Sequence, residues 1–425
     1  MLIVERIRHA YESSPIRRGF IDLLSASFAI QFLGFGTLLL IPRFVSPEEL
    51  GDLKVLQSWI NLFAIAAGFG FNTAVLKLCA EERPDADRQS ILVRALGYTL
   101  VASAVMFLFA WVLSLLDLPR STDRVQSWLL VYALVLPFDA VTNLFAAYLQ
   151  ALKRIRDLAR AQLIVKAQAV LVIVFATWRF GFGGFVVATV VGYAIGLLPF
   201  VVRIGTETLR SRRSATPEGF WSLSTFSWLA NAVNTLGRHA DIYVLGLFYH
   251  NPRDLGYYAL AKIVVSGANV VTGTAQRIAL PYLSAASSDE RRFRKLAISA
   301  QWQTAVLAIA AAVVVHAAAL LLIRYFYAED YATAIRYLDI LLLRYVLWST
   351  FAVVGVATIA IGRSEYNLAG ASIATPLSLL LTWWMLRSNG TIGVAYAQVI
   401  SAAATFVLTA GLYRLAVGRY FRRSD

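Results

Sequence analysis

The sequence is short of charged residues, cysteine and histidine. Only 15% of its 425 residues are charged and 59% are apolar, whereas an average globular protein has roughly one-quarter charged residues. The single cysteine, Cys79, cannot form an intramolecular disulfide and gives no metal-ligand spacing. The four histidines are scattered along the chain, so we predict no metal site. These shortages exclude a disulfide-rich scaffold and argue against a soluble globular protein.

Features of catalytic sites are also missing from the sequence. It has no glycine-rich loop that would cradle phosphate, no close carboxylate pair in a large loop, and no polar domain that would hold a nucleotide sugar. The loops between its apolar stretches are short. We therefore predict that the chain is not an enzyme and uses no cofactor.

The sequence consists mainly of long apolar stretches, and its mean hydropathy is +0.64. A stretch of ~20 mainly apolar residues matches the hydrocarbon thickness of a bilayer. Each stretch is predicted to be a helix, because an unpaired backbone group in lipid costs several kcal/mol. The sequence thus predicts an all-α polytopic membrane protein with about twelve transmembrane helices. The predicted spans are residues 19–41, 53–76, 91–116, 126–150, 161–178, 183–202, 220–248, 256–283, 299–323, 337–361, 366–386 and 391–413.

The net charge of +14 is divided unevenly between alternate loops. Of the 39 Lys and Arg residues, 25 lie in the termini and the loops on their side, 9 lie in the opposite loops, and 5 lie within spans. Positive residues collect in the short cytoplasmic loops of membrane proteins. We therefore predict that both termini are cytoplasmic and that no nucleic acid is bound, because topology accounts for the charge.

An internal repeat relates the two halves at a constant offset of 205 residues. VSPEELGDLKVLQSWINLFAIAAGFGFNTAVLKL (45–78) aligns with YHNPRDLGYYALAKIVVSGANVVTGTAQRIALPYL (249–283). Six spans separate the copies, so we predict parallel repeats about an axis along the membrane normal. The identical pairs are Pro47/Pro252, Leu50/Leu255, Gly51/Gly256, Gly68/Gly273, Ala74/Ala279 and Leu78/Leu283.

The short Pro-x-x-Leu-Gly loop, followed by a helix with a late glycine, resembles the polysaccharide-export flippases. These form the Wzx-type branch of the multidrug/oligosaccharidyl-lipid/polysaccharide (MOP) superfamily. The resemblance is carried by PEELGDLKVLQSWINLFAIAAGFGFNTAVLK and by DIYVLGLFYHNPRDLGYYALAKIVVSGANVVTG with the closing ALPYLS. It implies a V-shaped, MATE-like fold in which two six-helix lobes surround a central hydrated cavity.

The resemblance also implies a function. It implies that undecaprenyl-pyrophosphate-linked oligosaccharide crosses the bacterial inner membrane by alternating access, for O-antigen, exopolysaccharide or capsule, driven by an H+ or Na+ gradient. The partners would be this lipid-linked substrate, the bilayer, and polysaccharide polymerase or assembly proteins. The alternatives are a drug/cation antiporter, a peptidoglycan-precursor flippase and, further off, a membrane-bound polysaccharide polymerase or ligase.

Domain bounds follow from the spans and the repeat. A basic amphipathic segment at one end and a basic tail at the other are predicted to be cytoplasmic, with one lobe on each side of a cytoplasmic linker. The predicted parts are residues 1–18 (amphipathic segment), 19–205 (N-terminal lobe), 206–219 (linker), 220–413 (C-terminal lobe) and 414–425 (tail).

Polar residues inside the spans recur at helical spacing, so each set lines one helix face. An ionised group at the bilayer centre costs about 2.5–3.5 kcal/mol unless it faces protein or water. The polar faces therefore predict a shared hydrated cavity. The residues predicted to line it are Asn231, Asn234, Asn269, Gln276, Gln57, Asn61, Asn72 and Asn143.

The cations among these residues are predicted to bind the pyrophosphate of the carrier, since Arg suits bidentate phosphate recognition. They are Arg238, Arg277, Lys262 and Arg344, and the candidates for ion coupling are Asp241 and Asp139. Structural alternatives stay open. Arg238 and Asp241 are three residues apart and could simply neutralise each other, and Lys262 and Arg344 could snorkel to the outer surface. The lone His316 is expected to serve only in packing.

Overall fold

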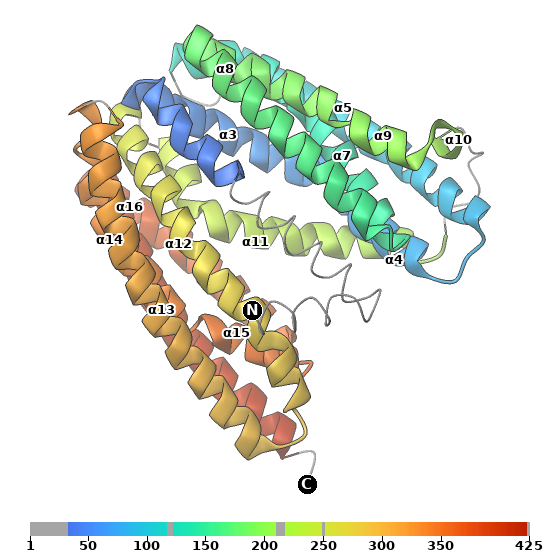
Figure 1. Ribbon diagram of the computed structural model, residues 1–425, viewed down its shortest axis with the longest axis vertical. Coiled ribbons are helices and arrows are strands. Elements are labelled where there is room, and N and C mark those ends of the chain that lie inside the picture. The colour runs from blue at the N-terminus through green and yellow to red at the C-terminus, as the bar shows by residue number, and fades with distance from the viewer. Residues whose placement is uncertain (1–32, 117–121, 210–216, 249–250, 328, 423–425) are drawn as a thin grey trace, which may run out of the picture. The chain divides into compact units, whose positions relative to one another are not determined.

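The computed structural model describes residues 33–116, 122–209, 217–248, 251–327 and 329–422. Every regular element in these ranges is a helix (Figure 1). The amphipathic segment 1–18 and the first half of span 19–41 lie outside the described residues, as do residues 210–216 of the linker 206–219 and the last residues of the tail. The side chains of Asn234 and Arg238 are likewise not described.

The membrane-spanning character of the chain is plain from its helices. Within the residues that the structure describes, six helices are long and apolar enough to cross a membrane, and up to eight when each of two bent pairs counts as one span. The bent pairs are α3 (Pro47–Gly68) with α4 (Phe71–Ala80), at 41°, and α6 (Asp123–Ala133) with α7 (Val135–Ala151), at 42°. The six are α5 (Asp85–Leu115), α8 (Ile155–Gly196) with the short helix after it, α12 (Pro252–Ala285), α13 (Glu290–Tyr325), residues 334–360 and α16 (Glu365–Phe421). A further long helix is α11 (Phe220–Phe248).

Two of these helices are hairpins of two spans. α8 with α9 (Leu198–Ile204) covers 50 residues and α16 covers 57, and each contains one glycine with non-helical angles, Gly181 and Gly390. A Cβ on Gly184 would overlap the carbonyl oxygen of Ala176, eight residues earlier. In a continuous helix, residues eight apart are separated by ~12 Å along the axis, so the chain reverses at Gly181. Gly393 and Met385 show the same reversal at Gly390.

The two hairpins repeat each other in sequence. Gly181 and Gly390 are 209 residues apart, as are Gly184 and Gly393, so the repeat extends beyond the motifs from which it was predicted. Both reversals fall where the sequence analysis ends one span and begins the next, near residues 181 and 389. The count of twelve spans itself stays a prediction.

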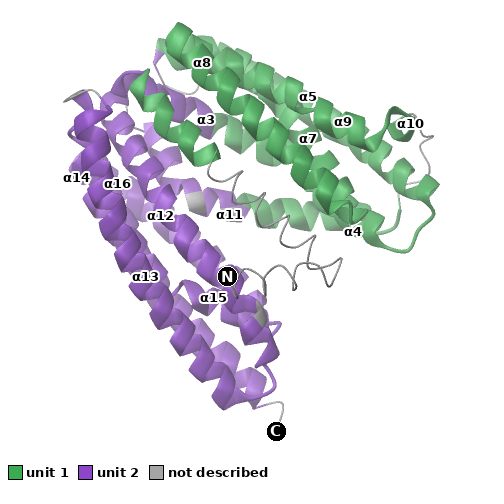
Figure 2. Cartoon of the chain, viewed as in Figure 1, with its two compact units in different colours: residues 1–44, 59–119, 123–232 green, residues 45–58, 120–122, 233–425 purple. Residues whose placement is uncertain are grey.

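The chain divides into two compact units (Figure 2). The first comprises residues 1–44, 59–119 and 123–232. In it α7 packs against α4, α5 and α8. Its core is built from these helices and closed by Phe220 at the start of α11, which stacks on Phe71 with ring centroids 5.8 Å apart.

The second unit comprises residues 45–58, 120–122 and 233–425. Its central helix is α12, which packs against α13, α14 (Ala334–Ser349) and α15 (Ala352–Ala360). A core around Phe293 and Phe421 joins α13 to the end of α16. The division between the two units falls within α3, after Ser58, and within α11, after Ala232. The predicted lobes, residues 19–205 and 220–413, stay a prediction. The compact units have other boundaries than the two halves of the sequence repeat, so they do not test the lobes.

The helix starts of the repeat lie in this second unit, and their caps are equivalent. Ser46 caps α3 in a capping box: its Oγ accepts from the Glu49 amide (3.2 Å), and Glu49 accepts from the Ser46 amide (3.1 Å). Asn251, 205 residues later, caps α12 by accepting from the amides of Arg253 and Asp254. A proline follows each cap at the first helical position, where its missing N–H costs nothing. Both helices therefore begin earlier than the predicted spans at 53 and 256.

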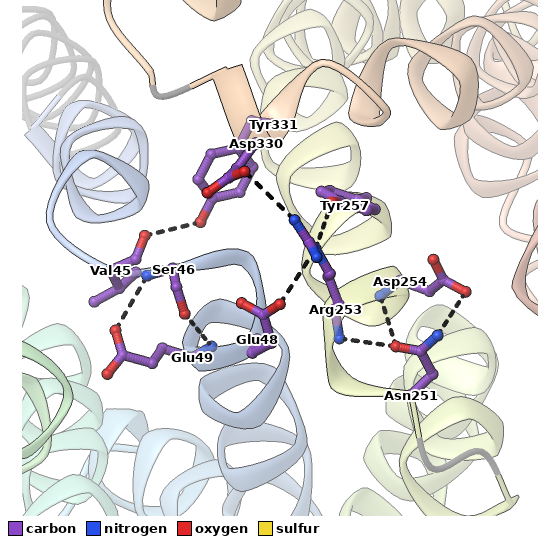
Figure 3. Close-up of polar contacts among 10 residues, drawn as sticks. All are labelled: Val45, Ser46, Glu48, Glu49, Asn251, Arg253, Asp254, Tyr257, Asp330 and Tyr331. Carbon is purple, nitrogen blue, oxygen red and sulfur yellow. Dashed lines mark hydrogen bonds and ion pairs between the residues drawn. The ribbon is translucent and has the colours of Figure 1, made fainter.

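Side chains bind the two starts together (Figure 3). The Arg253 guanidinium lies 3.2 Å from a Glu48 oxygen and 3.4 Å from Asp330, and its Nε donates to the Tyr257 hydroxyl (2.8 Å). Tyr331 donates to the carbonyl of Val45 (3.1 Å). Burial raises the pKa of the Tyr331 phenol, so it remains a neutral donor. The start of α3 is thus held to α12, and the segment before α3 is held to the loop before α14.

Candidate functional site

A buried carboxylate in α11 organises the candidate site, which lies within the second unit. Asp241 is 3% exposed. Its Oδ1 and Oδ2 accept hydrogen bonds from the Lys262 ammonium at 2.6 and 2.7 Å, and Oδ2 also accepts from the Tyr258 hydroxyl. Charge-assisted bonds of this length are the strong ones. Asp241 is therefore paired with a residue of the neighbouring helix.

Tyr258 and Lys262 reach Asp241 because they are one turn apart on α12. Residues at i and i+4 share a helix face. Tyr258 is fully buried, and its ring makes an edge contact with Tyr337 of α14, with centroids 6.1 Å apart. The Lys262 side chain, by contrast, keeps 30% of its surface exposed. The lysine is thus the accessible member of a triad whose carboxylate and phenol lie behind it.

Two further cations lie near this triad. Arg344 of α14 acts electrostatically on Asp241, Tyr258 and Lys262. Lys54 of α3 lies within electrostatic reach of Lys262, and its ammonium donates to Gln57 Oε1 at 2.9 Å. Two of these cations, Lys262 and Arg344, act on Asp241, and the third, Lys54, acts on Lys262, so this part of the second unit holds three cations and one carboxylate. An excess of positive charge among apolar helices is unfavourable unless water or an anion reaches it.

Other predicted residues lie on the surface of the helices or serve the fold. The side chains of Arg277, Asn269, Asn231, Asn61 and Asn143 are exposed, and that of Asn72 is half-buried. That these residues line a cavity or bind the substrate therefore stays a prediction. None of these residues is in contact with the Asp241 triad in any hydrogen bond or ion pair of the described residues.

Gln276 makes a hydrogen bond at a break between two helices. α14 ends at Ser349 and α15 begins at Ala352, inside one 27-residue span. Gln276 donates to the carbonyl of Ala352, the first residue of α15 (2.7 Å). Gln301 of α13 donates to the Ser349 carbonyl (2.9 Å) and accepts from the Val353 amide (3.0 Å). Backbone groups freed within a membrane must find such partners, so this polar network makes the break tolerable.

The first unit has a smaller polar cluster around Asp139 of α7. Asn143, one turn later, donates to Asp139 Oδ2 at 3.2 Å. Lys166 of α8 is the nearest cation that acts on this carboxylate. A carboxylate with an amide and a distant cation could take up a proton or a small cation, which is the role predicted for it.

Lys54 and Tyr258 are not among the site residues predicted from the sequence. Lys54 lies at the start of the predicted span 53–76. It falls three residues before Gln57 and seven before Asn61, which is the spacing of one helix face. Tyr258 stands four residues before Lys262, and that spacing was the available signal.

The lone His316 contacts a residue of the neighbouring helix. Its Nδ1 lies 3.0 Å from Asp339 Oδ1, and both side chains are partly exposed. The pairing joins α13 to α14, which pack side by side in the second unit. Surrounding alanines and valines in the sequence suggested an apolar setting, but the neighbour comes from the next helix.

Comparisons with known proteins agree with this architecture. The sequence profile of a family described as "Polysaccharide biosynthesis protein" matches residues 16–287. Stage V sporulation protein B of Bacillus subtilis (strain 168) is 26% identical over 168 residues, which make up 38% of this chain and 32% of that protein. The chain therefore matches about a third of the relative's length.

Two solved structures share the fold. The lipid II flippase MurJ in an inward closed conformation gives a TM-score of 0.74 at 14% identity, covering 94% of this chain and 91% of that one. An inward-facing multidrug resistance MATE family transporter of the MOP superfamily gives 0.72 at 14% identity, covering 95% and 99%. The predicted all-α, MATE-like membrane fold is confirmed.

Proposed function

Because the chain belongs to the polysaccharide biosynthesis protein family and has the fold of MurJ and MATE transporters, we propose that it is a lipid-linked oligosaccharide flippase. Its substrate would be an oligosaccharide on undecaprenyl pyrophosphate, moved across the bacterial inner membrane by alternating access. The pathway would be O-antigen, exopolysaccharide or capsule synthesis, with polymerase or assembly proteins as partners. Both termini would be cytoplasmic, as the distribution of Lys and Arg indicates.

The observation that carries this proposal is the excess of cations at the buried triad. Lys262 pairs with Asp241, Arg344 acts on the same carboxylate, and Lys54 acts on Lys262. A pyrophosphate would supply the missing negative charge and accept hydrogen bonds from ammonium and guanidinium groups. Arg277 and Arg238 are proposed to extend this recognition along α12 and α11. The glycan would lie among the amide side chains, and the prenyl tail would stay in lipid.

The same charge balance disfavours the alternative of a drug/cation antiporter. An organic cation would meet three like charges and one carboxylate already bound by Lys262. Since Lys262 occupies both oxygens of Asp241, Asp139 of the first unit is the better candidate for H+ or Na+ coupling. The substrate of a peptidoglycan-precursor flippase carries the same pyrophosphate, so only the glycan distinguishes that alternative from the proposed function.

The proposed function is tested by measuring in which leaflet of the membrane the lipid-linked oligosaccharide lies. Deleting the gene should strand completed lipid-linked oligosaccharide on the cytoplasmic leaflet while polymer disappears outside. Purified protein in liposomes should restore access of the glycan to an external glycosidase, and empty liposomes are the control. If the purified protein lengthened or transferred a glycan in detergent, where no leaflets exist, an enzyme would replace the transporter.

A further inference from the structure

We propose that Asp241 is a built-in competitor for the substrate's anionic head group: Lys262 is bound to Asp241 when the site is empty and changes partner when a phosphate arrives. This inference rests on the proposed function, because it assumes that the cationic cluster binds a phosphate. It concerns a different property, namely how tightly the site holds that phosphate.

The geometry places the ammonium between the carboxylate and the accessible side. Asp241 is 3% exposed while the Lys262 side chain is 30% exposed, so an approaching anion meets the lysine first. An ammonium has three donors, and two of the short contacts of Lys262 go to Asp241. A phosphate must therefore compete with Asp241 for most of the hydrogen-bonding capacity of Lys262.

Asp241 is also prepared for the loss of its lysine. A buried carboxylate left without a partner is strongly destabilising. Here Tyr258 still donates to Oδ2, and Arg344 still acts on the same charge. Lys54 repels Lys262 and favours its transfer to an anion. The exchange thus moves one ammonium between two anions and leaves no charge without compensation.

Competition by Asp241 lowers the affinity of the cationic site for the phosphate of the substrate. A transporter must release its substrate on the far side, and a site of three uncompensated cations would hold a pyrophosphate too tightly. After release, Asp241 takes Lys262 back and thereby opposes rebinding. Asp241 acts in this scheme as a positioning residue, since it acts on the substrate only through Lys262.

The experiment measures the dissociation constant of farnesyl pyrophosphate for the full chain in lipid nanodiscs by calorimetry. Farnesol, which lacks the phosphates, reports binding by the tail alone. Since hydrogen bonds to charged groups are the strong ones, we expect Asp241→Asn to bind about tenfold tighter and Lys262→Ala about tenfold weaker. In the Lys262→Ala background, Asp241→Asn should produce a much smaller gain.

Two further variants separate competition from a structural role. Tyr258→Phe keeps every charge but removes a hydrogen bond from Asp241, so the carboxylate should hold Lys262 more firmly and the probe should bind several-fold weaker. A structural role would shift Asp241→Asn and Tyr258→Phe in the same direction. Asp339→Asn is the matched control, since it removes a half-exposed carboxylate from α14 of the same unit, and it should leave the dissociation constant within twofold.

Each outcome of these binding measurements supports or refutes the inference. If wild type binds the probe and Asp241→Asn binds no tighter than Asp339→Asn, competition is refuted and the proposed function stands. If no variant binds farnesyl pyrophosphate better than farnesol, the proposed function fails and this inference fails with it. If Asp241→Asn does not fold, Tyr258→Phe decides alone, and tighter or unchanged binding refutes the inference.

Discussion

Gly51 and Gly256 occupy equivalent positions in the two repeats, and each packs against the carbonyl oxygen of the proline that begins the other's helix. A Cβ on Gly51 would overlap the oxygen of Pro252, and one on Gly256 would overlap the oxygen of Pro47. Such a reciprocal contact is what a two-fold axis between α3 and α12 produces. The contact explains why glycine stands at this point of both motifs: only glycine lets the two backbones approach so closely.

Adding a methyl group at this contact should therefore destabilise the protein. Gly51→Ala or Gly256→Ala must push a backbone carbonyl aside, and overpacking of this kind costs about 1–3 kcal/mol. The midpoint of thermal unfolding of the purified protein in detergent should fall in both variants. The repeat supplies the control: Gly68 and Gly273 also match each other but have open space around them. Gly68→Ala and Gly273→Ala should leave the midpoint unchanged or raise it.

Much of the fold was predictable because its signals are local. Apolar run length marks the spans, and a proline after a capping residue marks the starts of α3 and α12. The repeat follows from identities at one offset. The hairpin reversals at Gly181 and Gly390 fall between predicted spans because glycine is the residue that tolerates the angles found there.

The candidate site was less predictable because its contacts join different helices. Spacing along α11 offers only Arg238 as a partner for Asp241, whereas the structure pairs Asp241 with Lys262, 21 residues away. The spacing of polar residues along a helix shows which of its faces is polar, but not which residue of a neighbouring helix that face contacts. Gln276 is predicted to line a cavity, and the spacing along α12 gave no sign that it donates to the carbonyl of Ala352.

The pairing of Asp241 with Lys262 predicts a specific rescue. Lys262→Met alone removes the main partner of a buried carboxylate, and Tyr258 and Arg344 compensate for that loss only in part, so membrane levels of the protein should fall. Adding Asp241→Asn should restore those levels, because a neutral amide needs no counter-ion. Immunoblots of membrane fractions measure both effects. Polymer export should stay low in the double variant, since the proposed phosphate ligand is still missing. Full export by that variant would refute a substrate role for Lys262.

Cysteine labelling tests the topology, and the structure changes how it must be done. Cys79 is fully buried, so its protection from an impermeant thiol reagent would reflect packing, whichever side of the membrane it faced. The native cysteine should therefore be replaced by serine. Arg253→Cys, at a half-exposed position, should then be labelled in intact cells. Arg156→Cys, also at an exposed position, should be labelled only after lysis. Equal labelling of the two from outside would contradict the predicted cytoplasmic termini.

The break between α14 and α15 depends on one side chain of α13. Gln301 satisfies two backbone groups at once, the Ser349 carbonyl and the Val353 amide. Gln301→Leu keeps the volume but leaves both groups without this partner, and each buried unsatisfied group costs about 1–3 kcal/mol. We expect a clear fall in the thermal unfolding midpoint and faster amide hydrogen exchange at residues 349–353. Gln303→Leu is the matched control: Gln303 lies two residues further along the same helix, is exposed, and bonds only to the side chain of Ser299 in the described contacts. Because the same substitution is made on the same helix, equal destabilisation by the two variants would show that the break does not need Gln301.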